Sequence, residues 1–297
     1  MFLQQLVTGI SVGGIYALLA TGYSLIYSLL DFSNWAHGEF AMVSAYIAIV
    51  LSSFMGMPFV LAAVGGMAGG ALVSFLCERF AYRRIRRNGA PNMFLMIAAM
   101  GLSNVFQQAA NLIFSGQYRS YPFKLPVSTI KVASAYIGVL DLVSLAITAV
   151  IITILVYLIN KTQFGLNVRA IACNAHAAKV LGVKVDRCIA TVFVLAGALA
   201  GVAGVLYGMK YNVFPTMGNV GLKAFIASVI GGLGSVPGAI VGAIILGVIE
   251  TFVSAFISSS LRDFFSFALL IVLLLVKPSG PVSYTHLRAH ETCADLV

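Results

Sequence analysis

The sequence has few charged residues: Asp, Glu, Lys and Arg together make up 9% of its 297 positions, and only 9 residues are acidic. Hydrophobic residues supply 60% of the chain, and the mean hydropathy is +1.00. This composition excludes an ordinary soluble domain, which needs more polar surface than the chain can provide. The formal charge of +9 does not require a nucleic-acid partner, because basic loops on one side of a membrane account for it.

Cysteine is also rare, and none of its four copies shows the Cys-x-x-Cys spacing; they are Cys77, Cys173, Cys188 and Cys293. We therefore expect neither a disulfide framework nor a zinc site. The sequence lacks a Gly-x-x-x-x-Gly-Lys-Ser/Thr loop, a Ser/His/Asp arrangement and a His-Glu-x-x-His helix. The chain is thus predicted not to hydrolyse ATP at a Walker-type site, and we expect no catalytic residue, cofactor or metal.

Repeated apolar runs of about 20 residues dominate the chain, and runs of this length cross a bilayer as helices. We predict an all-α transmembrane bundle with about eight full spans and one broken half-helix. The first span is expected to be retained, because 1–5 lacks the basic region of a signal peptide. The predicted spans are 3–30, 40–54, 59–77, 93–114, 136–159, 189–208, the second part of 223–257, and 261–276.

Residues 223–257 are too long for one crossing, and the glycine-rich run 231–238 interrupts them. We expect a half-helix, a break and then a full span, which leaves the topology of the last third open. The composition changes at 281, so we assign 1–280 to one transmembrane domain and 281–297 to a polar tail. His286 and His290, with a nearby cysteine, suggest a metal site in this tail, but the expected interpretation is a disordered tail or a sequence artefact.

Basic residues gather in two places, with five arginines in 79–87 and five lysines or arginines in 161–187. The positive-inside rule therefore places both segments in the cytoplasm. The segment 115–135 carries only three basic residues and is expected outside.

The longest polar interruption, 160–188, contains a predicted short helix. Asn174 is suited to its N-cap and Gly182 to its C-terminal stop. The run His176-Ala177-Ala178, followed by Gly182, resembles the Glu-Ala-Ala-x-x-x-Gly coupling loop of ATP-binding-cassette importer permeases, with His176 in place of the acid. The same spacing also fits an ordinary amphipathic connector.

Three polar residues, Asn34, His37 and Glu39, fall at a break between two apolar runs. Polar groups at membrane depth are expensive and commonly face a cavity or a partner, so these residues are candidates for the translocation path or its gate. The alternative is that they satisfy backbone groups freed by the break, with Glu39 favoured by the helix dipole. One residue can serve both purposes.

Four amides share one face of the fourth span, at positions 0, 3, 4 and 7: Asn104, Gln107, Gln108 and Asn111. They either line an aqueous route or hydrogen-bond to neighbouring helices. Glu250 and Lys223 are isolated charges in the last third. Glu250 is a further path candidate, and a buried pair with Lys223 is the structural alternative.

Four motifs together are similar to the LivH-type permeases of branched-chain amino acid importers: Asn-Trp-Ala-His-Gly-Glu at 34–39, Glu-Arg-Phe-Ala-Tyr-Arg at 78–83, Leu-Gly-Val-Lys-Val-Asp-Arg at 181–187, and 221–225 continued by 231–239. The resemblance implies a multi-pass subunit of the bacterial inner membrane. It further implies a second permease as a hetero-dimer partner, two cytoplasmic ATP-binding-cassette ATPases and a periplasmic substrate-binding protein. Branched-chain amino acids, or related amino acids, amides or urea, are the implied cargo.

Three other functions are compatible with an apolar bundle. An ion-coupled secondary transporter of small polar solutes would use the break at 231–238 as an ion site. A passive channel would allow downhill flux without partners. A structural membrane scaffold would show no dependence on solute.

Overall fold

The structure, a computed structural model, describes residues 2–122, 129–132 and 135–276. The predicted polar tail at 281–297 lies outside these residues. In the described part the chain is almost entirely helical, as the apolar runs predict. Eight of its helices are long and apolar enough to cross a membrane, which confirms the predicted bundle.

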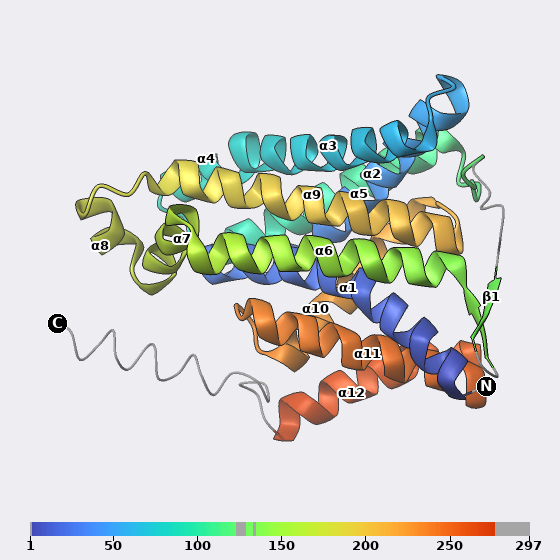
Figure 1. Ribbon diagram of the computed structural model, residues 1–297. Helices are drawn as coiled ribbons and strands as arrows, with labels where there is room; N and C mark the ends of the chain where they lie inside the picture. Colours follow the sequence, from blue (N-terminus) through green and yellow to red (C-terminus); the bar gives the residue numbers. More distant parts are fainter. Residues whose placement is uncertain (1, 123–128, 133–134, 277–297) are drawn as a thin grey trace.

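The elements in chain order are α1 Phe2–Leu30, α2 His37–Ile49, η1 Val50–Phe54, α3 Phe59–Cys77, η2 Glu78–Tyr82, α4 Arg83–Arg87, α5 Asn92–Phe114, β1 Thr129–Val132, β2 Ala135–Gly138, α6 Val139–Lys161, α7 Gln163–Cys173, α8 Ala175–Val180, α9 Val185–Tyr211, η3 Pro215–Asn219, α10 Val220–Gly231, α11 Val236–Phe256, η4 Ser259–Leu261 and α12 Arg262–Val276 (Figure 1). The predicted half-helix is α10, and residues 232–235 form the predicted break before α11.

Some boundaries differ from the sequence prediction. Helix α2 begins at His37 and α9 at Val185, each a few residues earlier than the apolar pattern indicates. Tyr136 does not begin the fifth span. It lies in β2, which pairs antiparallel with β1 so that Tyr136 faces Lys131 in the register. Residues 129–132 and 135–138 therefore pair their backbones as two antiparallel strands and do not begin the helix.

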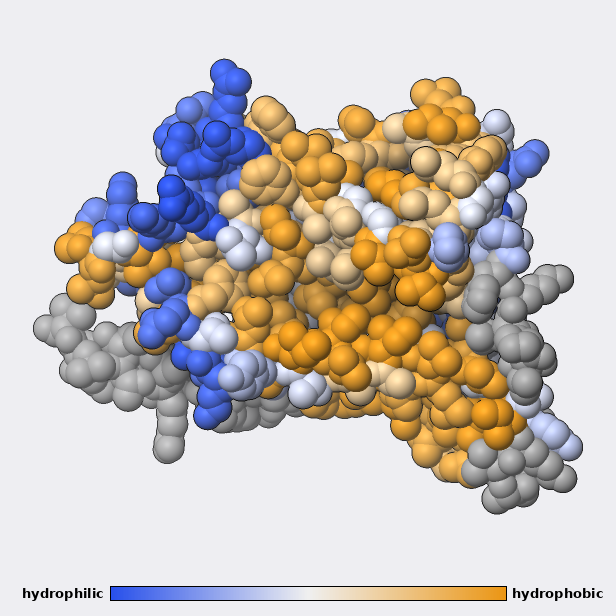
Figure 2. Space-filling view, turned by 45° about the horizontal axis from the view of Figure 1, so that its top comes forward, coloured by the Kyte–Doolittle hydropathy of each residue, from blue (hydrophilic) through white to orange (hydrophobic). Residues whose placement is uncertain are grey.

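The two ends of the bundle differ in charge. Helices α4, α7 and α8 lie at one end, here called the basic end, while the N-terminus and the β1–β2 hairpin lie at the other (Figure 1). Figure 2 shows an apolar band over the middle of the visible surface and the most hydrophilic residues at the left. The positive-inside rule assigns the basic end to the cytoplasm.

This orientation resolves the topology of the last third. Phe252 of α11 contacts Phe2 edge to face near the outer end, with ring centroids 5.1 Å apart. Gly234, in the break after α10, lies beside Tyr27 and Ser28 near the inner end of α1. Helix α10 is therefore a short inward pass, α11 returns outward, and α12 runs inward again.

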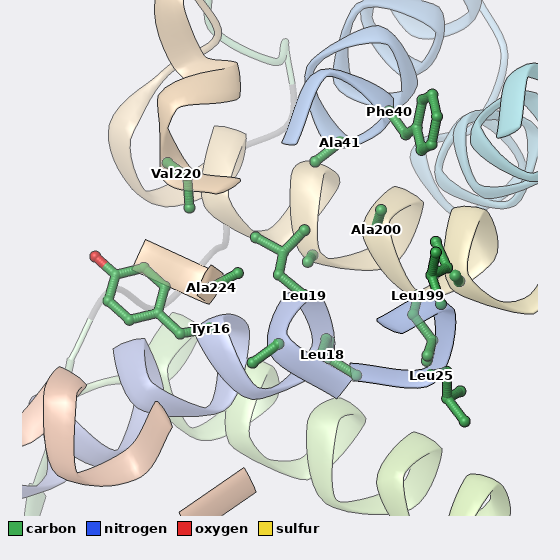
Figure 3. Packing of buried hydrophobic residues seen from close by; sticks show 14 of the residues in the cluster. Tyr16, Leu18, Leu19, Leu25, Phe40, Ala41, Leu199, Ala200, Val220 and Ala224 are labelled. Atoms are coloured by element: carbon green, nitrogen blue, oxygen red, sulfur yellow. The ribbon is translucent and has the colours of Figure 1, made fainter. Parts of the chain in front are cut away.

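Helix α1 occupies the centre of the bundle, and every residue in 11–26 is buried. It packs against α6, α9, α10 and α11. Its glycines, serines and threonines suit this position, because small residues let neighbouring helices approach closely in a membrane. Figure 3 shows Leu18 and Leu19 of α1 among the buried side chains of neighbouring helices, with Ala224 of α10 beside Tyr16.

Glycines allow α1 and α11 to approach closely. A Cβ added at Gly13 would stand 2.8 Å from the Cα of Ile244, and one at Gly9 would stand 2.9 Å from the Cα of Val248. From the other side, a Cβ at Gly247 would overlap the backbone of Gly13. The two helix backbones are thus in direct contact, as small residues permit in membrane bundles.

We predict that Gly247→Leu destabilises the protein by about 1–3 kcal/mol, because the new side chain has no space between two backbones. Unfolding in detergent, followed by the fluorescence of Trp35, would measure the change. Gly101→Leu is the matched control, because a Cβ at Gly101 meets nothing within 4 Å. Equal stability of the two variants would contradict the assigned α1–α11 contact.

Candidate functional site

The chain re-enters the bundle between α1 and α2. His37, the first residue of α2, places Nε2 3.1 Å from the carbonyl oxygen of Leu19. Leu19 precedes the end of α1 at Leu30 by eleven residues, or roughly 16 Å of helix. Helix α2 therefore begins well inside the bundle, as the polar break in the sequence suggests.

Asn34 fixes the conformation of this re-entrant segment. Its Oδ1 accepts hydrogen bonds from the Tyr82 hydroxyl at 2.9 Å and from the Ala36 N–H at 3.2 Å. Asn34 thus satisfies one freed backbone group, as the structural alternative predicts. Tyr82 belongs to η2, so this contact also joins the segment to the inner end of α3.

Glu39 joins α2 to α5. Its side chain is buried, and Oε1 accepts a hydrogen bond from the Ser103 hydroxyl at 3.1 Å. Helix α2 has no side-chain cap, so Glu39 acts on the helix start only through its place in the first turn, where a negative charge is favoured. Gly218 of η3 lies against the carboxyl group, because a Cβ there would overlap it.

Four polar side-chain atoms in 34–39 are buried without a partner among the described residues: Asn34 Nδ2, Trp35 Nε1, His37 Nδ1 and Glu39 Oε2. Most buried polar atoms in proteins are hydrogen-bonded, so this density is unusual. The segment therefore has unused donors and acceptors in the interior of the bundle, where a polar solute or water would satisfy them.

The four amides of α5 lie on a partly exposed face of that helix. Asn104 and Gln108 are exposed, and Gln107 and Asn111 are half-buried. Asn104 Nδ2 donates to the carbonyl of Met100 in its own helix, at 3.0 Å. Among the described residues, no other helix hydrogen-bonds to these four amides, so the face is open to a path or to another subunit.

Glu250 and Lys223 meet, as the structural alternative in the sequence predicts. The Glu250 carboxylate is buried, and Oε1 lies 2.9 Å from Lys223 Nζ. Arg262 adds a second ion pair, with Nε 2.7 Å from Oε2. Tyr16 and Ser266 donate hydroxyl hydrogen bonds at 2.9 and 2.6 Å. The buried charge is thus fully paired, which is the condition under which its burial is tolerated.

The sequence reasoning missed Arg262 and Asp263. They begin α12, and Asp263 Oδ1 lies 2.9 Å from Lys223 Nζ. Their only signal was a pair of opposite charges at the start of an apolar span, which also fits an ordinary helix end. The pairing with Lys223 joins segments about forty residues apart, and one-dimensional spacing does not reveal it.

The predicted helix in the polar loop is present as α8. Asn174 caps it, with Oδ1 accepting from the N–H groups of His176 and Ala177, each at 3.0 Å. Gly182 follows with a φ of +89°, a backbone conformation that favours glycine. A second helix, α7, which the sequence did not indicate, fills the first half of the loop.

The tip of α8 is apolar and exposed. The side chains of Val180 and Leu181 are 76% and 82% exposed, whereas Ala178 is buried. Just beyond, Asp186 at the start of α9 forms ion pairs of 2.9 Å with three arginines: Arg83, Arg86 and Arg87. This cluster, also missed by sequence reasoning, connects the loop to the inner end of α3 through α4.

Comparisons with known proteins agree with these features. Residues 5–274 match the model of a protein family described as branched-chain amino acid transport system, permease component. The chain is 36% identical to the high-affinity branched-chain amino acid transport system permease protein BraD of Pseudomonas aeruginosa, over 94% of this chain and 95% of that one. It is 35% identical to the corresponding LivH protein of Escherichia coli K12, over 94% of each chain.

A solved structure has the same fold. PsaBC from Streptococcus pneumoniae, in complex with Fab, aligns with a TM-score of 0.50 over 97% of this chain and 95% of that chain, at 14% sequence identity. At this identity the likeness concerns the fold alone. Since the family match spans nearly all of the described residues, the chain belongs to the family of permease components of branched-chain amino acid transport systems.

Proposed function

We propose that the chain is a permease subunit of an ATP-binding-cassette importer that moves branched-chain or related amino acids into the cytoplasm. Its partners would be a second permease, two cytoplasmic ATPases and an external substrate-binding protein. In this proposal residues 1–280 form the permease domain of an inner-membrane protein, and 160–188 form its coupling loop. The observation that carries the proposal is α8, a capped helix whose apolar tip projects from the basic end.

The apolar tip of α8 favours a protein partner. Val180 and Leu181 are strongly exposed at an end of the molecule that is otherwise rich in arginine and lysine. A six-residue helix gains little stability from its own backbone, so its position depends on the Asn174 cap and on what packs against it. A groove on a cytoplasmic ATPase would cover both side chains and hold the helix in place.

Force applied to α8 has a route into the bundle. The link 181–184 is short, and Asp186 at the start of α9 is held by arginines of α4. Helix α9 packs against α3, and both pack against α2, which carries His37 and Glu39. Movement of α8 would therefore reach the re-entrant segment through packed helices, which is the behaviour required of a coupling loop.

We propose that the solute passes along polar residues of the re-entrant segment, of the open face of α5 and of α11. The candidates are Asn34, His37, Glu39, Asn104, Gln107, Asn111 and Glu250. Glu39 and the α5 amides are supported by the unpaired Oε2 atom and by the lack of interhelical bonds on that face. Glu250 is better explained as the anchor of an ion-pair cluster, since its oxygens are already paired.

The test of this function is reconstitution. The chain would be purified with its co-purifying subunits, identified by mass spectrometry, and placed in liposomes with the binding protein outside. ATP-dependent uptake of leucine, isoleucine or valine is expected. Uptake that runs on an ion gradient without ATP, or downhill flux through this chain alone, would instead support the secondary transporter or the channel.

We predict that Leu181→Asp weakens co-purification with the ATPases at least about tenfold, because it places a charge at the centre of an apolar contact. The protein should fold normally, since the side chain is 82% exposed. Leu181→Met keeps the apolar volume and serves as the matched control. Unchanged recovery of the ATPases with Leu181→Asp would show that α8 does not dock through its tip.

We predict that Glu39→Gln lowers uptake about tenfold while assembly and thermal stability are preserved. Glutamine keeps the shape of the side chain and can still accept from Ser103, but it removes the charge and one acceptor oxygen. Uptake and co-purification would be measured on the same preparation. If Glu39→Gln transports at the wild-type rate, the residue is a structural link between α2 and α5.

A further inference from the structure

A cavity of about 520 Å³ lies at the outer part of the chain, between η3, α10, the end of α9 and the start of α12. Its volume falls within the range of roughly 300–1,000 Å³ that is usual for small-molecule sites. One wall is polar and includes Asn219, Lys223, Arg262 and Asp263. The sequence reasoning singled out Lys223 but not the cavity, because the lining residues come from three separate stretches of the sequence, at 207, 214–226 and 259–267.

The two cations in the wall have donors to spare. Arg262 donates from Nε to Glu250 and from Nη2 to the Tyr16 hydroxyl, and Tyr211 is a further hydrogen-bond partner. A guanidinium has five N–H groups, so these three contacts leave donors available. Lys223 contacts one oxygen each of Glu250 and Asp263, which leaves a third ammonium hydrogen. Both side chains can therefore receive an anionic group without giving up their existing partners.

The two acids in this cluster differ in availability. Glu250 is 1% exposed and accepts from four side chains, so it holds the cations in place rather than facing the cavity. Asp263 is 69% exposed, and its ion pair with Lys223 uses only Oδ1. The cavity thus presents free donors on two cations beside a free carboxylate oxygen, a pattern complementary to a zwitterion.

The lining also contains apolar side chains, among them Phe214, Met217, Ile226 and Phe267. Figure 3 shows the Tyr16 ring near Val220, another lining residue, with its hydroxyl directed away from the labelled leucines of α1. An aliphatic side chain placed against these residues would be removed from water, while the charged groups of the same molecule reach the polar wall.

The cavity also adjoins the re-entrant segment. Met217 of η3 lines the cavity, and the next residue, Gly218, lies against the Glu39 carboxyl group. Only the η3 turn therefore separates the cavity from the Glu39 carboxyl group. A solute leaving the cavity inward would therefore next meet the unpaired acceptor of Glu39.

We propose that this cavity binds a zwitterionic α-amino acid with an aliphatic side chain. Arg262 and Lys223 receive the carboxylate, Asp263 receives the ammonium group, and the apolar lining that includes Met217 and Phe267 contacts the side chain. The cargo class rests on the proposed import function, whereas the site rests on the geometry above. The cavity would be the first place in the permease that holds a solute released by the external binding protein.

The experiment uses the assembled transporter in nanodiscs, without the binding protein, and equilibrium binding of three probes. These are L-leucine, 4-methylpentanoate, which lacks the ammonium group, and 3-methylbutylamine, which lacks the carboxylate. We expect leucine to bind at least about tenfold more tightly than either analogue, because each analogue loses one charge-assisted contact.

Asp263→Asn should weaken leucine binding at least about tenfold and leave 4-methylpentanoate unchanged, because that probe has no ammonium group. Asp263→Glu should restore most of the leucine affinity. Asp31→Asn is the matched control, an exposed aspartate at the opposite end of α1. Since Asp263 is largely exposed, its variants are expected to fold, and thermal unfolding would verify this.

Two results would overturn the site. One is the absence of leucine binding by the wild-type complex, and the other is an equal loss of leucine and 4-methylpentanoate in Asp263→Asn, which would mark a structural role. If ATP-dependent leucine uptake persists in either case, the import function stands and only the site is wrong. If the complex neither binds nor transports amino acids, the proposed function fails with it.

Discussion

The burial of α1 is the constraint on which the other features depend. Its residues 11–26 are covered on all sides, so a polar group brought against it is removed from water and needs a hydrogen-bond partner within the bundle. The helix supplies these partners at successive turns. Tyr16 donates to Glu250 of α11, the Leu19 carbonyl lies within hydrogen-bonding distance of His37 of α2, and the Ala20 carbonyl accepts from Ser228 of α10. The glycine contacts with α11 then fix how close these groups come.

Irregular backbone inside a membrane protein is tolerated only where protein or a polar cavity surrounds it. The two irregular segments here obey this rule in the same region. The re-entrant chain before α2 and the turn η3 before α10 meet where Gly38 lies against the backbone of Gly218 and Gly221. Any side chain at Gly38 would separate them. The charged cavity lies on one side of η3 and Glu39 lies on the other. The backbone contact of Gly38 with Gly218 and Gly221 therefore holds the two sites close together.

Much of the fold follows from the sequence, because a span needs only a long apolar run and a break needs only glycine and polar residues. The N-cap of α8 could also be predicted, because Asn174 accepts hydrogen bonds from backbone N–H groups only two and three residues further along the chain. Local patterns fail where partners are distant in sequence. Asp186 meets three arginines about a hundred residues earlier, and Arg262 meets Tyr16 across most of the chain. These contacts form only when the helices pack together, so they cannot be predicted from composition and spacing.

Helix α9 connects the two charged clusters. It runs without interruption from Val185 to Tyr211, roughly 40 Å, and its first turn holds Asp186 against the arginines of α4. At its far end Tyr207 lines the outer cavity, and the ring of Tyr211 lies 5.7 Å from the guanidinium of Arg262. Helix α10, by contrast, has 12 residues and ends at Gly231, and the following residue, Gly232, has a φ of +95°. A continuous helix therefore joins the loop 160–188 at the basic end to the outer cavity, whereas α10, which packs against α1 and α11, is short and ends at a glycine break. This combination suits a protein in which a push at one end must change access at the other.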